Sequence, residues 1–569
     1  MRPLAAIRSG WLLLALSTAA WLPAFALADP ATTSTTTSTN SVPKDPSRAI
    51  ADDPKGTLAR GLDLERKHQW TPALQVYRDA KLRWPASTDF DDRTRLCEMH
   101  LKLARRYGDQ SFRNVLLRMP DDRAFALFDE MIDRIETHYV DPVALEPLVR
   151  RGFDNLEVAL RDPQFAFLTM NAKGATAERV AWLRDQLRGR RDRLAVPDQI
   201  AARDQVALAC ELARKALAIP KAAVVMEFVF GACDALPDDY TAYLTPDKLD
   251  DMFAIIDGNF VGLGVELKID PQGLRLVGVI RGGPASAAGL KAGDRIVAIG
   301  GKSVRGLGLD EAAGRLQGAE GTRVDIAVLR ADGSRRDYQL VRRHVEVESV
   351  TQAKIVEPGS GVGYIQLAGF QKSSAEEVDR AIRSLRRQGM KYLVLDLRGN
   401  PGGLLNVAVD IADRFIDAGV IVSTRGRAPG QTQVYRARPD KPYTMDLAVL
   451  VDHDSASASE ILAGALQELG RAVVIGDSTS YGKGSVQSIF ELKSVPAGLK
   501  LTTAKFYSPK DRPYHKSGVV PDIPVTVRAK PVADPSAEDA EIPDLGDPAT
   551  DPVLAIAVQQ ARRQMASRR

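Results

Sequence analysis

The spacing of apolar residues changes from one part of the chain to the next. In residues 121–257 apolar positions recur every three or four residues, which is the spacing of one buried helix face. The clearest stripe consists of Phe125, Phe128, Met131, Ile132 and Ile135. We therefore expect this region to be mostly helical and to pack on the core that follows it, with charged, solvated helix faces over 174–219.

Residues 258–343 have a different pattern, in which glycine is dense and short runs favour β-strands. The runs that predict strands are 264–269, 274–280, 295–299, 323–330 and 338–342. One helix is expected between them, over 310–316. This pattern predicts a small β-rich domain over 258–343.

Beyond residue 361, strand-like and helix-like segments alternate. The predicted strands are 362–367, 392–397, 447–451 and 472–475, and the predicted helices are 375–388, 404–416 and 457–469. Such alternation implies right-handed βαβ crossovers and a largely parallel sheet. The expected fold class is therefore multidomain α/β: an α/β core over 344–528, an inserted β-rich domain and N-terminal helical regions.

The first residues have the composition of a targeting segment. Arg2 and Arg8 precede an apolar run over 11–27 that ends in the small-x-small pattern of a secretory signal peptide, here residues 1–28. An uncleaved membrane anchor is the alternative, but polar residues and a proline interrupt the run, which favours cleavage. Residues 29–55 are rich in Thr, Ser, Pro and Asp and are expected to form a disordered tether. The mature protein is then exported and soluble.

Two further segments flank these regions. Within 56–107 two helices are expected, with the spacing of one tetratricopeptide-like hairpin: Gly61, Trp70, Ala73, Tyr77, Ala80 and Pro85. A solenoid needs about three such units. The region 56–120 is therefore either an arm that binds a partner such as an adaptor protein or, as we favour, helices packed on the rest of the chain. At the other end, 529–569 reads as an acidic, Pro-rich linker and a helix over 553–565 with no assignable role.

Composition narrows the classes of function. A chain of 569 residues corresponds to about three to five domains, and 44% apolar with 26% charged residues is ordinary globular composition. With 77 Lys and Arg against 73 Asp and Glu, the net charge of +4 gives no argument for nucleic acid. Three cysteines fit buried apolar positions, and the six scattered histidines include no His-Glu-x-x-His motif. No metal or cofactor is expected.

Chemistry is expected first at a glycine-rich turn, Leu397-Arg398-Gly399-Asn400-Pro401-Gly402-Gly403, that follows a predicted strand. Glycines let backbone N–H groups approach a ligand and form an anion-binding concavity. A plain turn between a strand and a helix is an equally good interpretation of this run.

A second run, Asp452-His453-Asp454-Ser455-Ala456-Ser457-Ala458-Ser459-Glu460, ends a strand and opens a helix. A serine in such a place is most often only an N-cap. Three serines that alternate with alanines exceed what a cap needs. A hydroxyl at a helix N-terminus also lies beside backbone N–H groups that suit a developing oxyanion.

A third candidate is Lys483, which lies between Gly482 and Gly484. A phosphate loop is rejected, because the spacing after Gly476 is one residue too long and the following sequence is β-like rather than helical. A lysine between glycines can approach another backbone closely and is a candidate catalytic amine. The sequence contains no Gly-x-Ser-x-Gly elbow, and nothing raises a Ser-His-Asp triad with His453 above chance. A Ser–Lys pair is the remaining solution.

Together these motifs resemble the C-terminal processing peptidases, tail-specific serine proteases with an inserted PDZ domain. The likeness also includes 501–507 and 518–522, and it covers roughly 121–527. The PDZ signature is carried by Gly283-Pro284-Ala285, Ala288-Gly289-Leu290 and Gly293-Asp294-x-Ile296. The resemblance identifies 258–343 as a PDZ domain and 344–528 as the serine protease core.

The resemblance implies roles for individual residues. Ser457 would be the nucleophile, Lys483 the general base and Gln487 the residue that orients the lysine. The segment between Ser457 and Lys483 is one residue longer than usual, and the stretch 235–240 lacks the family's signature histidine. In an extended strand Lys483 and Gln487 would lie roughly 13 Å apart, so we expect the chain to curl at the glycines beside Lys483.

The implied oxyanion hole consists of backbone N–H groups of Gly402 or Gly403 and of Ala458. Neutral Lys483 would take the proton from Ser457, whose alkoxide attacks the scissile carbonyl to form an acyl-enzyme that water releases. A free lysine has a pKa of about 10.4. Burial is therefore expected to lower the pKa of Lys483, so that it acts as a base near neutral pH.

PDZ domains bind an extended C-terminal tail by strand addition, with its carboxylate in a nest of N–H groups. Here the nest would be Val261-Gly262-Leu263-Gly264, and Leu263, Val265 and Leu316 would line an apolar pocket. The expected function is an exported serine endopeptidase that cleaves proteins with free, apolar C-termini, in the bacterial periplasm or membrane-anchored if the signal stays uncleaved. The alternative is an inactive protease-fold scaffold whose PDZ domain and helical arm bind partners.

Overall fold

The computed structural model of the protein describes residues 12–16, 53–170, 175–270, 273–305, 309–438, 442–527 and 545–567. The predicted signal peptide lies outside them except for β1 (Leu12–Leu16), as do the predicted tether up to residue 52 and the predicted linker up to residue 544. The chain divides into a helical unit, Trp21–Asp247 with Ile489–Thr502, and an α/β unit, Met1–Ala20, Lys248–Ser488 and Thr503–Arg569. Within the described ranges, no helix combines the length and the apolar character needed to cross a membrane.

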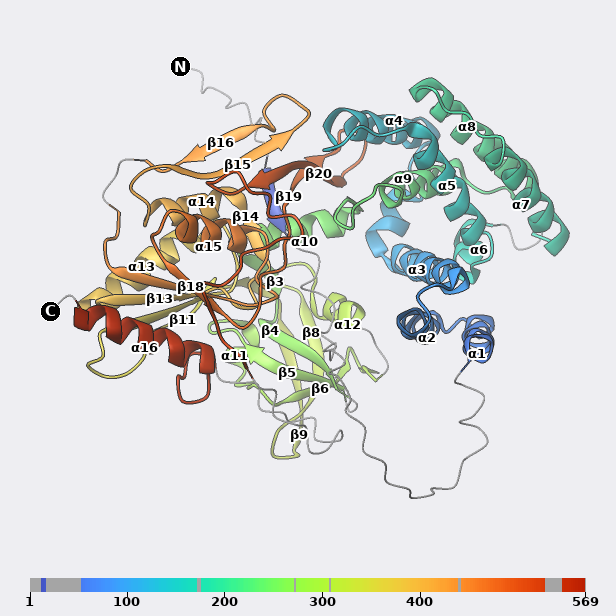
Figure 1. Ribbon diagram of the computed structural model, residues 1–569. Helices are drawn as coiled ribbons and strands as arrows, with labels where there is room; N and C mark the ends of the chain where they lie inside the picture. Colours follow the sequence, from blue (N-terminus) through green and yellow to red (C-terminus); the bar gives the residue numbers. More distant parts are fainter. Residues whose placement is uncertain are drawn as a thin grey trace, which may run out of the picture. The chain divides into compact units, whose positions relative to one another are not determined.

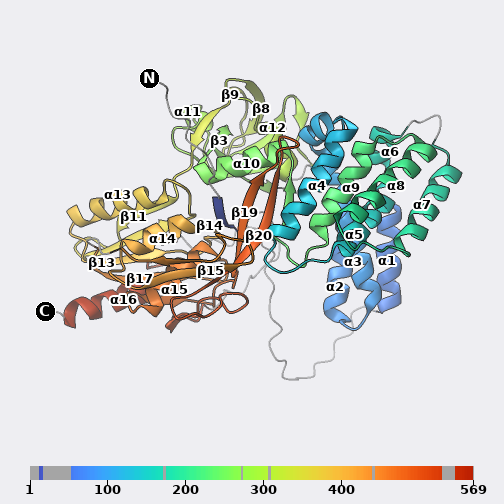
Figure 2. The same cartoon turned by 90° about the horizontal axis from the view of Figure 1, so that it is seen from above.

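The helical unit is shown in Figure 2. Its elements are α1 (Pro54–Arg66), α2 (Trp70–Arg83), α3 (Thr88–Gly108), the π-turn η3 (Phe112–Leu116), α4 (Asp121–His138), α5 (Leu145–Ala159), α6 (Pro163–Thr169), α7 (Ala177–Arg191), α8 (Gln199–Leu217), α9 (Lys221–Asp234) and β2 (Ala242–Leu244). Helix α9 is buried on nearly all sides because it packs against α4, α5 and α8. The predicted stripe is confirmed on α4, where Phe128, Met131, Ile132 and Ile135 are buried. The predicted burial of the cysteines is confirmed for Cys97, Cys210 and Cys233, which are free thiols.

The beginning of the helical unit differs from the prediction. Over residues 53–108 the structure contains the three helices α1, α2 and α3 rather than two. The chain breaks at His68, which adopts a left-handed φ of 54°, and again just before Pro85, where α2 has ended at Arg83. Gly61 lets α1 approach α2, since a Cβ there would overlap the Tyr77 ring. That contact explains the hairpin-like spacing of these two residues.

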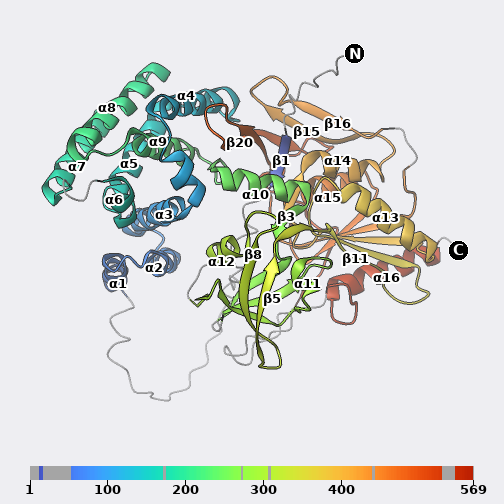
Figure 3. The same ribbon diagram turned by 180° about the vertical axis from the view of Figure 1, so that it is seen from behind.

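The β-rich domain of the α/β unit is an antiparallel sheet with two short helices (Figure 3). Its elements are β4 (Val265–Asp270), β5 (Gly273–Val279), α11 (Pro284–Ala287), β6 (Arg295–Ile299), β7 (Lys302–Ser303), α12 (Leu309–Leu316), β8 (Arg323–Leu329) and β9 (Arg335–Val341). The predicted strands and helix are confirmed with small shifts of their ends. The spatial order is β4-β5-β6-β8-β9, so β4 forms one edge of the sheet. The strands β3 (Asn259–Gly262) and β10 (Arg343–Glu346) pair where the chain enters and leaves the domain.

The α/β core is built on a second sheet. Its elements are β11 (Val350–Ile355), β12 (Val362–Leu367), α13 (Ser374–Arg387), β13 (Tyr392–Asp396), α14 (Leu405–Asp413), β17 (Asp446–Val451), α15 (Ala458–Glu468), β18 (Val473–Gly476), β21 (Ile523–Pro524) and α16 (Pro552–Ser567). Neighbouring strands from β12 to β21 run parallel, which confirms the prediction, and β11 is antiparallel to β12. Helices α13, α14 and α15 lie on one face of the sheet and α16 lies on the other (Figure 1).

A further sheet was not predicted. It joins β14 (Gly402–Leu404), β1, β19 (Ser485–Glu491), β20 (Gly498–Tyr507), β15 (Val420–Gly426) and β16 (Gln433–Arg436) in that order. Its strands come from distant parts of the chain, so no local alternation of segments reveals their pairing. Strand β14 occupies the start of the predicted helix 404–416, which begins instead at Leu405 and ends at Asp413.

Candidate active site

Ser457 lies immediately before α15, at the end of the loop that follows β17. Its φ of 61° is in the left-handed region, which costs a residue with a Cβ on the order of 1–3 kcal/mol. Its side chain is fully buried, at 0% exposure. A serine in a strained turn at the start of a helix has the setting of a nucleophile elbow, although the sequence motif for one is missing.

The two serines beside Ser457 contact the glycine-rich turn. The Ser455 hydroxyl donates to the Leu397 carbonyl at 2.8 Å, and the Ser459 hydroxyl donates to the Asn400 carbonyl at 2.9 Å. These bonds tie the start of α15 to the turn. The two flanking hydroxyls therefore fix the backbone, a role distinct from the one predicted for Ser457.

The glycine-rich turn, residues 397–403, is held by its own asparagine. The Asn400 Nδ2 donates to the Leu367 carbonyl at 2.7 Å, and the Asn400 Oδ1 accepts from the Gly402 N–H at 2.9 Å. Gly403 adopts a φ of 149°, and a Cβ there would overlap the Phe370 carbonyl oxygen. Only glycine therefore fits at position 403. At position 402 the backbone N–H is already bound to the Asn400 side chain.

Lys483 lies in the segment before β19, and its neighbours confirm the predicted close approach of another backbone. Gly482 has a left-handed φ of 84°, and its carbonyl accepts from the Lys516 N–H at 2.8 Å. A Cβ at Gly484 would overlap the His515 backbone. The flanking glycines thus let the chain around Lys483 pack against this backbone, and the lysine is 1% exposed.

Glu460 connects the two candidate residues and was not predicted. Its Oε2 accepts from the N–H of Ser457 at 2.7 Å and from the N–H of Lys483 at 2.9 Å, so one carboxylate oxygen holds both backbones. Its Oε1 accepts from the Ser480 hydroxyl at 2.7 Å and from the Gly482 N–H at 2.6 Å. Burial raises the pKa of this carboxyl, and the four donors oppose that rise. The sequence signal for it is the capping-box spacing, a glutamate three residues after the serine.

Gln487 lies in β19 and is fully buried, with its Nε2 donating to the Ser485 hydroxyl at 3.0 Å. The segment 477–480, which the resemblance predicts to be one residue longer than usual, is also fixed. Its Ser480 hydroxyl donates to Glu460 and accepts from the Val519 N–H at 2.7 Å. The longer segment is therefore part of the network around Glu460.

His453 lies outside this buried setting. Its side chain is exposed, and its ring centre lies 5.8 Å from that of Tyr481. The neighbouring Asp452 accepts from the Gly399 N–H at 3.0 Å and from the Ser455 N–H at 2.9 Å, and burial raises the pKa of Asp452 despite these donors. The Asp452 carboxylate therefore fixes the glycine-rich turn.

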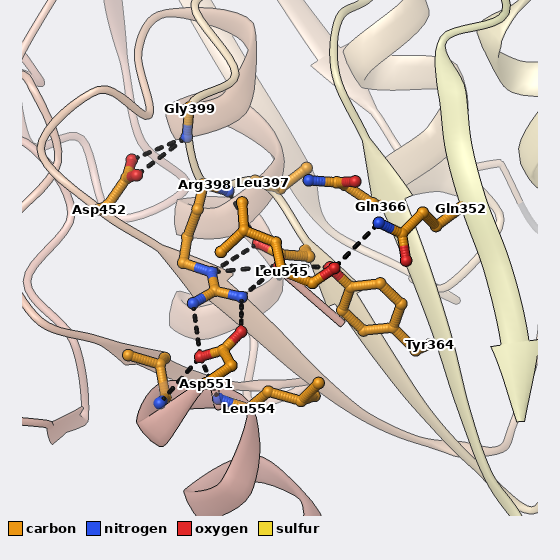
Figure 4. Close-up of polar contacts among 12 residues, drawn as sticks. Gln352, Tyr364, Gln366, Leu397, Arg398, Gly399, Asp452, Leu545, Asp551 and Leu554 are labelled. Carbon is orange, nitrogen blue, oxygen red and sulfur yellow. Dashed lines mark hydrogen bonds and ion pairs between the residues drawn. The ribbon is translucent and has the colours of Figure 1, made fainter. Parts of the chain in front are cut away.

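Arg398, in the same turn, is the centre of a buried ion-pair network that was not predicted (Figure 4). Its guanidinium binds Asp396 through Nε at 3.0 Å and Nη2 at 2.6 Å. It binds Asp551, just before α16, through Nη1 at 2.9 Å and Nη2 at 2.5 Å. The Tyr364 hydroxyl donates to Asp396 at 2.8 Å. Burial alone would lower the pKa of Arg398, but the two carboxylates outweigh it and raise that pKa.

The ion pair of Asp551 is expected to stabilise the fold in a pH-dependent way. Burial alone would raise its pKa, but the hydrogen bonds and charge of Arg398 hold it below the ordinary value of 3.8. The stabilisation is therefore complete above pH 3.8 and is lost as the pH falls through the folded-state pKa.

Removing one partner of a buried pair costs about 3–5 kcal/mol, so we expect Asp551→Asn to lower the unfolding temperature at pH 7. Calorimetry of both proteins from pH 7 down to acid should show the gap between them closing below pH 3.8, where Asp551 becomes protonated. A gap of equal size at every pH would contradict the ion-pair explanation.

Two residues of the predicted PDZ nest lie in a paired strand. Val261 and Gly262 lie in β3, opposite His344 and Arg343 of β10, so their backbones belong to a strand pair. The sequence could not show this, because the partner strand lies at the other end of the domain.

The residues after Gly262 form the turn into β4. Gly264 has a φ of 73°, and its carbonyl accepts from the Ile280 N–H at 2.9 Å. Leu263 and Leu316 belong to the apolar core of the domain, and Val265 packs against that core from the start of β4. Leu263 and Gly264 therefore lead into the edge strand β4, which begins at Val265.

Strand β1 lies next to the glycine-rich turn. It occupies the place between β14 and β19, and its register sets Ala15 opposite Gly403 and Leu16 opposite Gly402. An extended segment of chain therefore fits along β14.

The chain is similar to known proteins. Residues 361–525 match the model of peptidase family S41, and residues 275–330 match that of the PDZ domain. The carboxyl-terminal-processing protease of Synechocystis sp. is 38% identical over 291 residues, which is 50% of this chain and 67% of that protein. Its counterpart in Picosynechococcus sp. is 37% identical over 290 residues, 50% of this chain and 69% of that protein.

Among solved structures, the photosystem II D1 C-terminal processing protease shares 25% identity, over 71% of this chain and 93% of that chain, with a TM-score of 0.39. The identities of the two curated relatives and the two domain matches confirm the resemblance inferred from the motifs. The chain therefore belongs to the carboxyl-terminal-processing proteases of peptidase family S41, which are serine-type enzymes, and it contains a PDZ domain.

Proposed function

We propose that the protein is an exported endopeptidase in which Ser457 is the nucleophile and Lys483 is the general base. The observation that carries the proposal is the Glu460 carboxylate, which binds the N–H groups of both residues through one oxygen. Export is supported by the signal-like composition of residues 1–28, and the bacterial periplasm is the proposed compartment.

The chemistry follows from the burial of Lys483. Its side chain is 1% exposed, and burial disfavours an ammonium ion, so the neutral amine takes the proton of the Ser457 hydroxyl. The alkoxide attacks the scissile carbonyl, and the leaving amine takes the proton back from Lys483 as the acyl-enzyme forms. Neutral Lys483 then takes a proton from a water molecule, which attacks the acyl carbon, and the Ser457 oxygen leaves with the proton returned by Lys483. Gln487, buried in β19, is proposed to orient the lysine.

The developing oxyanion needs backbone donors. Ala458 is the first residue of α15, and N–H groups in the first turn of a helix have no acceptor within the helix. We assign the second donor to Gly403, because the Gly402 N–H is bound to Asn400. The place of β1 between β14 and β19 supports a substrate path that brings an extended peptide past Gly403.

Recognition of the substrate tail is proposed for the PDZ domain. Strand β4 is at the edge of its sheet and can accept an extended tail by strand addition. The N–H groups of Leu263, Gly264 and Val265 would receive the carboxylate, and the apolar surroundings of Leu316 would receive the last side chain.

Amidation of a substrate's C-terminus is expected to weaken its cleavage. The amide removes a charge-assisted hydrogen bond worth about 1.5–3 kcal/mol, which corresponds to a roughly 10- to 150-fold lower kcat/KM. Two peptides of one sequence, as acid and as amide, are compared at equal concentration. Equal turnover of the two forms would remove the PDZ domain from substrate selection.

The variant Glu460→Gln is expected to lose about 10²-fold in kcat/KM. The amide nitrogen of the new glutamine cannot accept the two hydrogen bonds that one carboxylate oxygen accepts in the wild type. Each buried N–H or O–H group left without an acceptor costs about 1–3 kcal/mol. The backbones of Ser457 and Lys483 then lose their common anchor. Peptide hydrolysis is measured for Glu460→Gln and for the control variant Glu491→Gln, which changes an exposed glutamate of β19. Full activity of Glu460→Gln would show that the anchor is dispensable.

The alternative of an inactive scaffold is tested by incubating casein with the wild type and with Ser457→Ala. The proposal predicts fragments only with the wild type, whereas a scaffold gives none with either protein. For the region 56–120, both the favoured packing on the rest of the chain and the alternative of a partner-binding arm stay predictions.

A further inference from the structure

Helix α16 lies beyond the segment that matches the peptidase family, which ends at residue 525. Its apolar face packs on buried side chains of β12, β13, β17 and β18, and consists of Val553, Leu554, Ala557, Val558 and Ala561. A parallel sheet needs cover on both faces. Helix α16 supplies that cover on the face opposite α13 to α15 (Figure 1), and is thus an integral part of the folded unit.

Asp551 joins this helix to the glycine-rich turn. Its Oδ1 accepts from the N–H groups of Val553 and Leu554 at 3.1 and 3.0 Å, which caps the helix. Both of its oxygens also bind Arg398 (Figure 4), and the two side chains are only 2% and 7% exposed. A bidentate pair fixes the plane and the position of the guanidinium.

Hydrogen bonds connect the residues that follow Arg398 to the start of α15. The next residue, Gly399, donates its N–H to Asp452 at 3.0 Å. The Asn400 carbonyl after it accepts from the Ala456 N–H at 3.0 Å and from the Ser459 hydroxyl at 2.9 Å. These contacts align the turn with the start of α15. Loss of Asp551 removes one of the two carboxylates that bind the buried guanidinium, and with it the bonds that tie Arg398 to α16.

We propose that Asp551 is a positioning residue of the peptidase site, and that its ion pair with Arg398 is a condition for a competent oxyanion hole. By clamping Arg398, Asp551 sets the turn that carries Gly403. The inference rests on the proposed function, since it needs Gly403 beside the reacting carbonyl. It gives the C-terminal segment of this chain a part in catalysis without contact with the substrate.

The test uses Asp551→Ser and Asp551→Asn in the full chain, because both new residues can cap a helix and neither carries the charge. Val558→Ala is the matched control, since it weakens the packing of α16 on the sheet and leaves the ion pair intact. We expect the Asp551 variants to lose about 10²-fold in kcat with KM changed less than about threefold. The control should keep kcat within about twofold of the wild type while its unfolding temperature falls.

Amide hydrogen exchange gives a readout that needs no activity. In the wild type, the amides of 397–404 should open together with those of α16, at one shared rate. In Asp551→Ser the turn should exchange faster than in Val558→Ala. The proposal is overturned if turn and helix open independently in the wild type, or if both variants lose kcat equally. If wild type and Ser457→Ala cleave alike, the proposed peptidase mechanism fails, and exchange alone then decides whether Asp551 couples α16 to the turn.

Discussion

The variant Ser457→Ala is expected to abolish proteolysis, with kcat/KM lower by on the order of 10⁴- to 10⁶-fold. The change removes the oxygen that forms the acyl bond, an oxygen that also takes part in a capping box with Glu460. The N–H of residue 457 can still donate to Glu460, and alanine carries the same Cβ at the left-handed φ as serine. The measurement is chromatographic detection of cleavage of a peptide with a free, apolar C-terminus, together with the unfolding temperature of both proteins.

The flanking serines provide the controls for this variant. Ser459→Ala loses one hydrogen bond to the Asn400 carbonyl, which also accepts from Ala456. We expect a stability loss of about 0.5–1.5 kcal/mol and retained activity. Ser455→Ala should also keep measurable activity. Full loss of activity only at Ser455 or Ser459, with activity kept in Ser457→Ala, would move the nucleophile to another residue.

The variant Lys483→Arg is expected to lose about 10²- to 10⁴-fold in kcat/KM although it keeps a basic side chain. A guanidinium stays protonated in proteins and cannot take the serine proton. The larger guanidinium must also fit a site in which the lysine is only 1% exposed. The measurement is the initial rate of peptide hydrolysis at a fixed pH near 8.

Lys510→Arg is the control for this substitution, since Lys510 is an exposed lysine of the same unit. Its activity should equal that of the wild type. An active Lys483→Arg enzyme would exclude the lysine as the base and would reopen a mechanism based on histidine.

The regular elements of the catalytic core were predictable because the local pattern of apolar residues shows which positions are buried. The run 362–367 is apolar on both faces, as a strand between covering layers must be, and it coincides with β12. In the PDZ domain, the predicted strand 295–299 likewise coincides with β6. The division of 53–108 into three helices was missed, because the break at His68 depends on a left-handed residue that is not a glycine.

The supporting network of the site was not predictable, because its partners lie far apart in sequence. Arg398 and Asp551 are separated by 153 residues, and Asp551 follows a segment whose composition indicates only a linker. Glu460 has no role that its motif alone predicts, since its contacts to Gly482 and Lys483 form only when two loops meet.

The family resemblance located the candidate residues but not which backbone donors are available. Gly402 and Gly403 are equivalent in the motif. The hydrogen bond from Gly402 to Asn400 distinguishes them, and it depends on a side-chain orientation that sequence alone does not show. In the same way, sequence alone does not show that the strand containing Val261 pairs with β10, which lies at the other end of the PDZ domain in the chain.

A Ser–Lys mechanism is tested most directly by kcat/KM as a function of pH for the wild type, His453→Ala and His515→Ala. Both histidines are exposed residues close in sequence or space to the candidate site. Burial and the charges of Lys516 and Lys505 lower the pKa of His515 below 6.5. The account predicts a single rise of kcat/KM with pH that persists unchanged in both histidine variants. A rise that disappears with either histidine would contradict it.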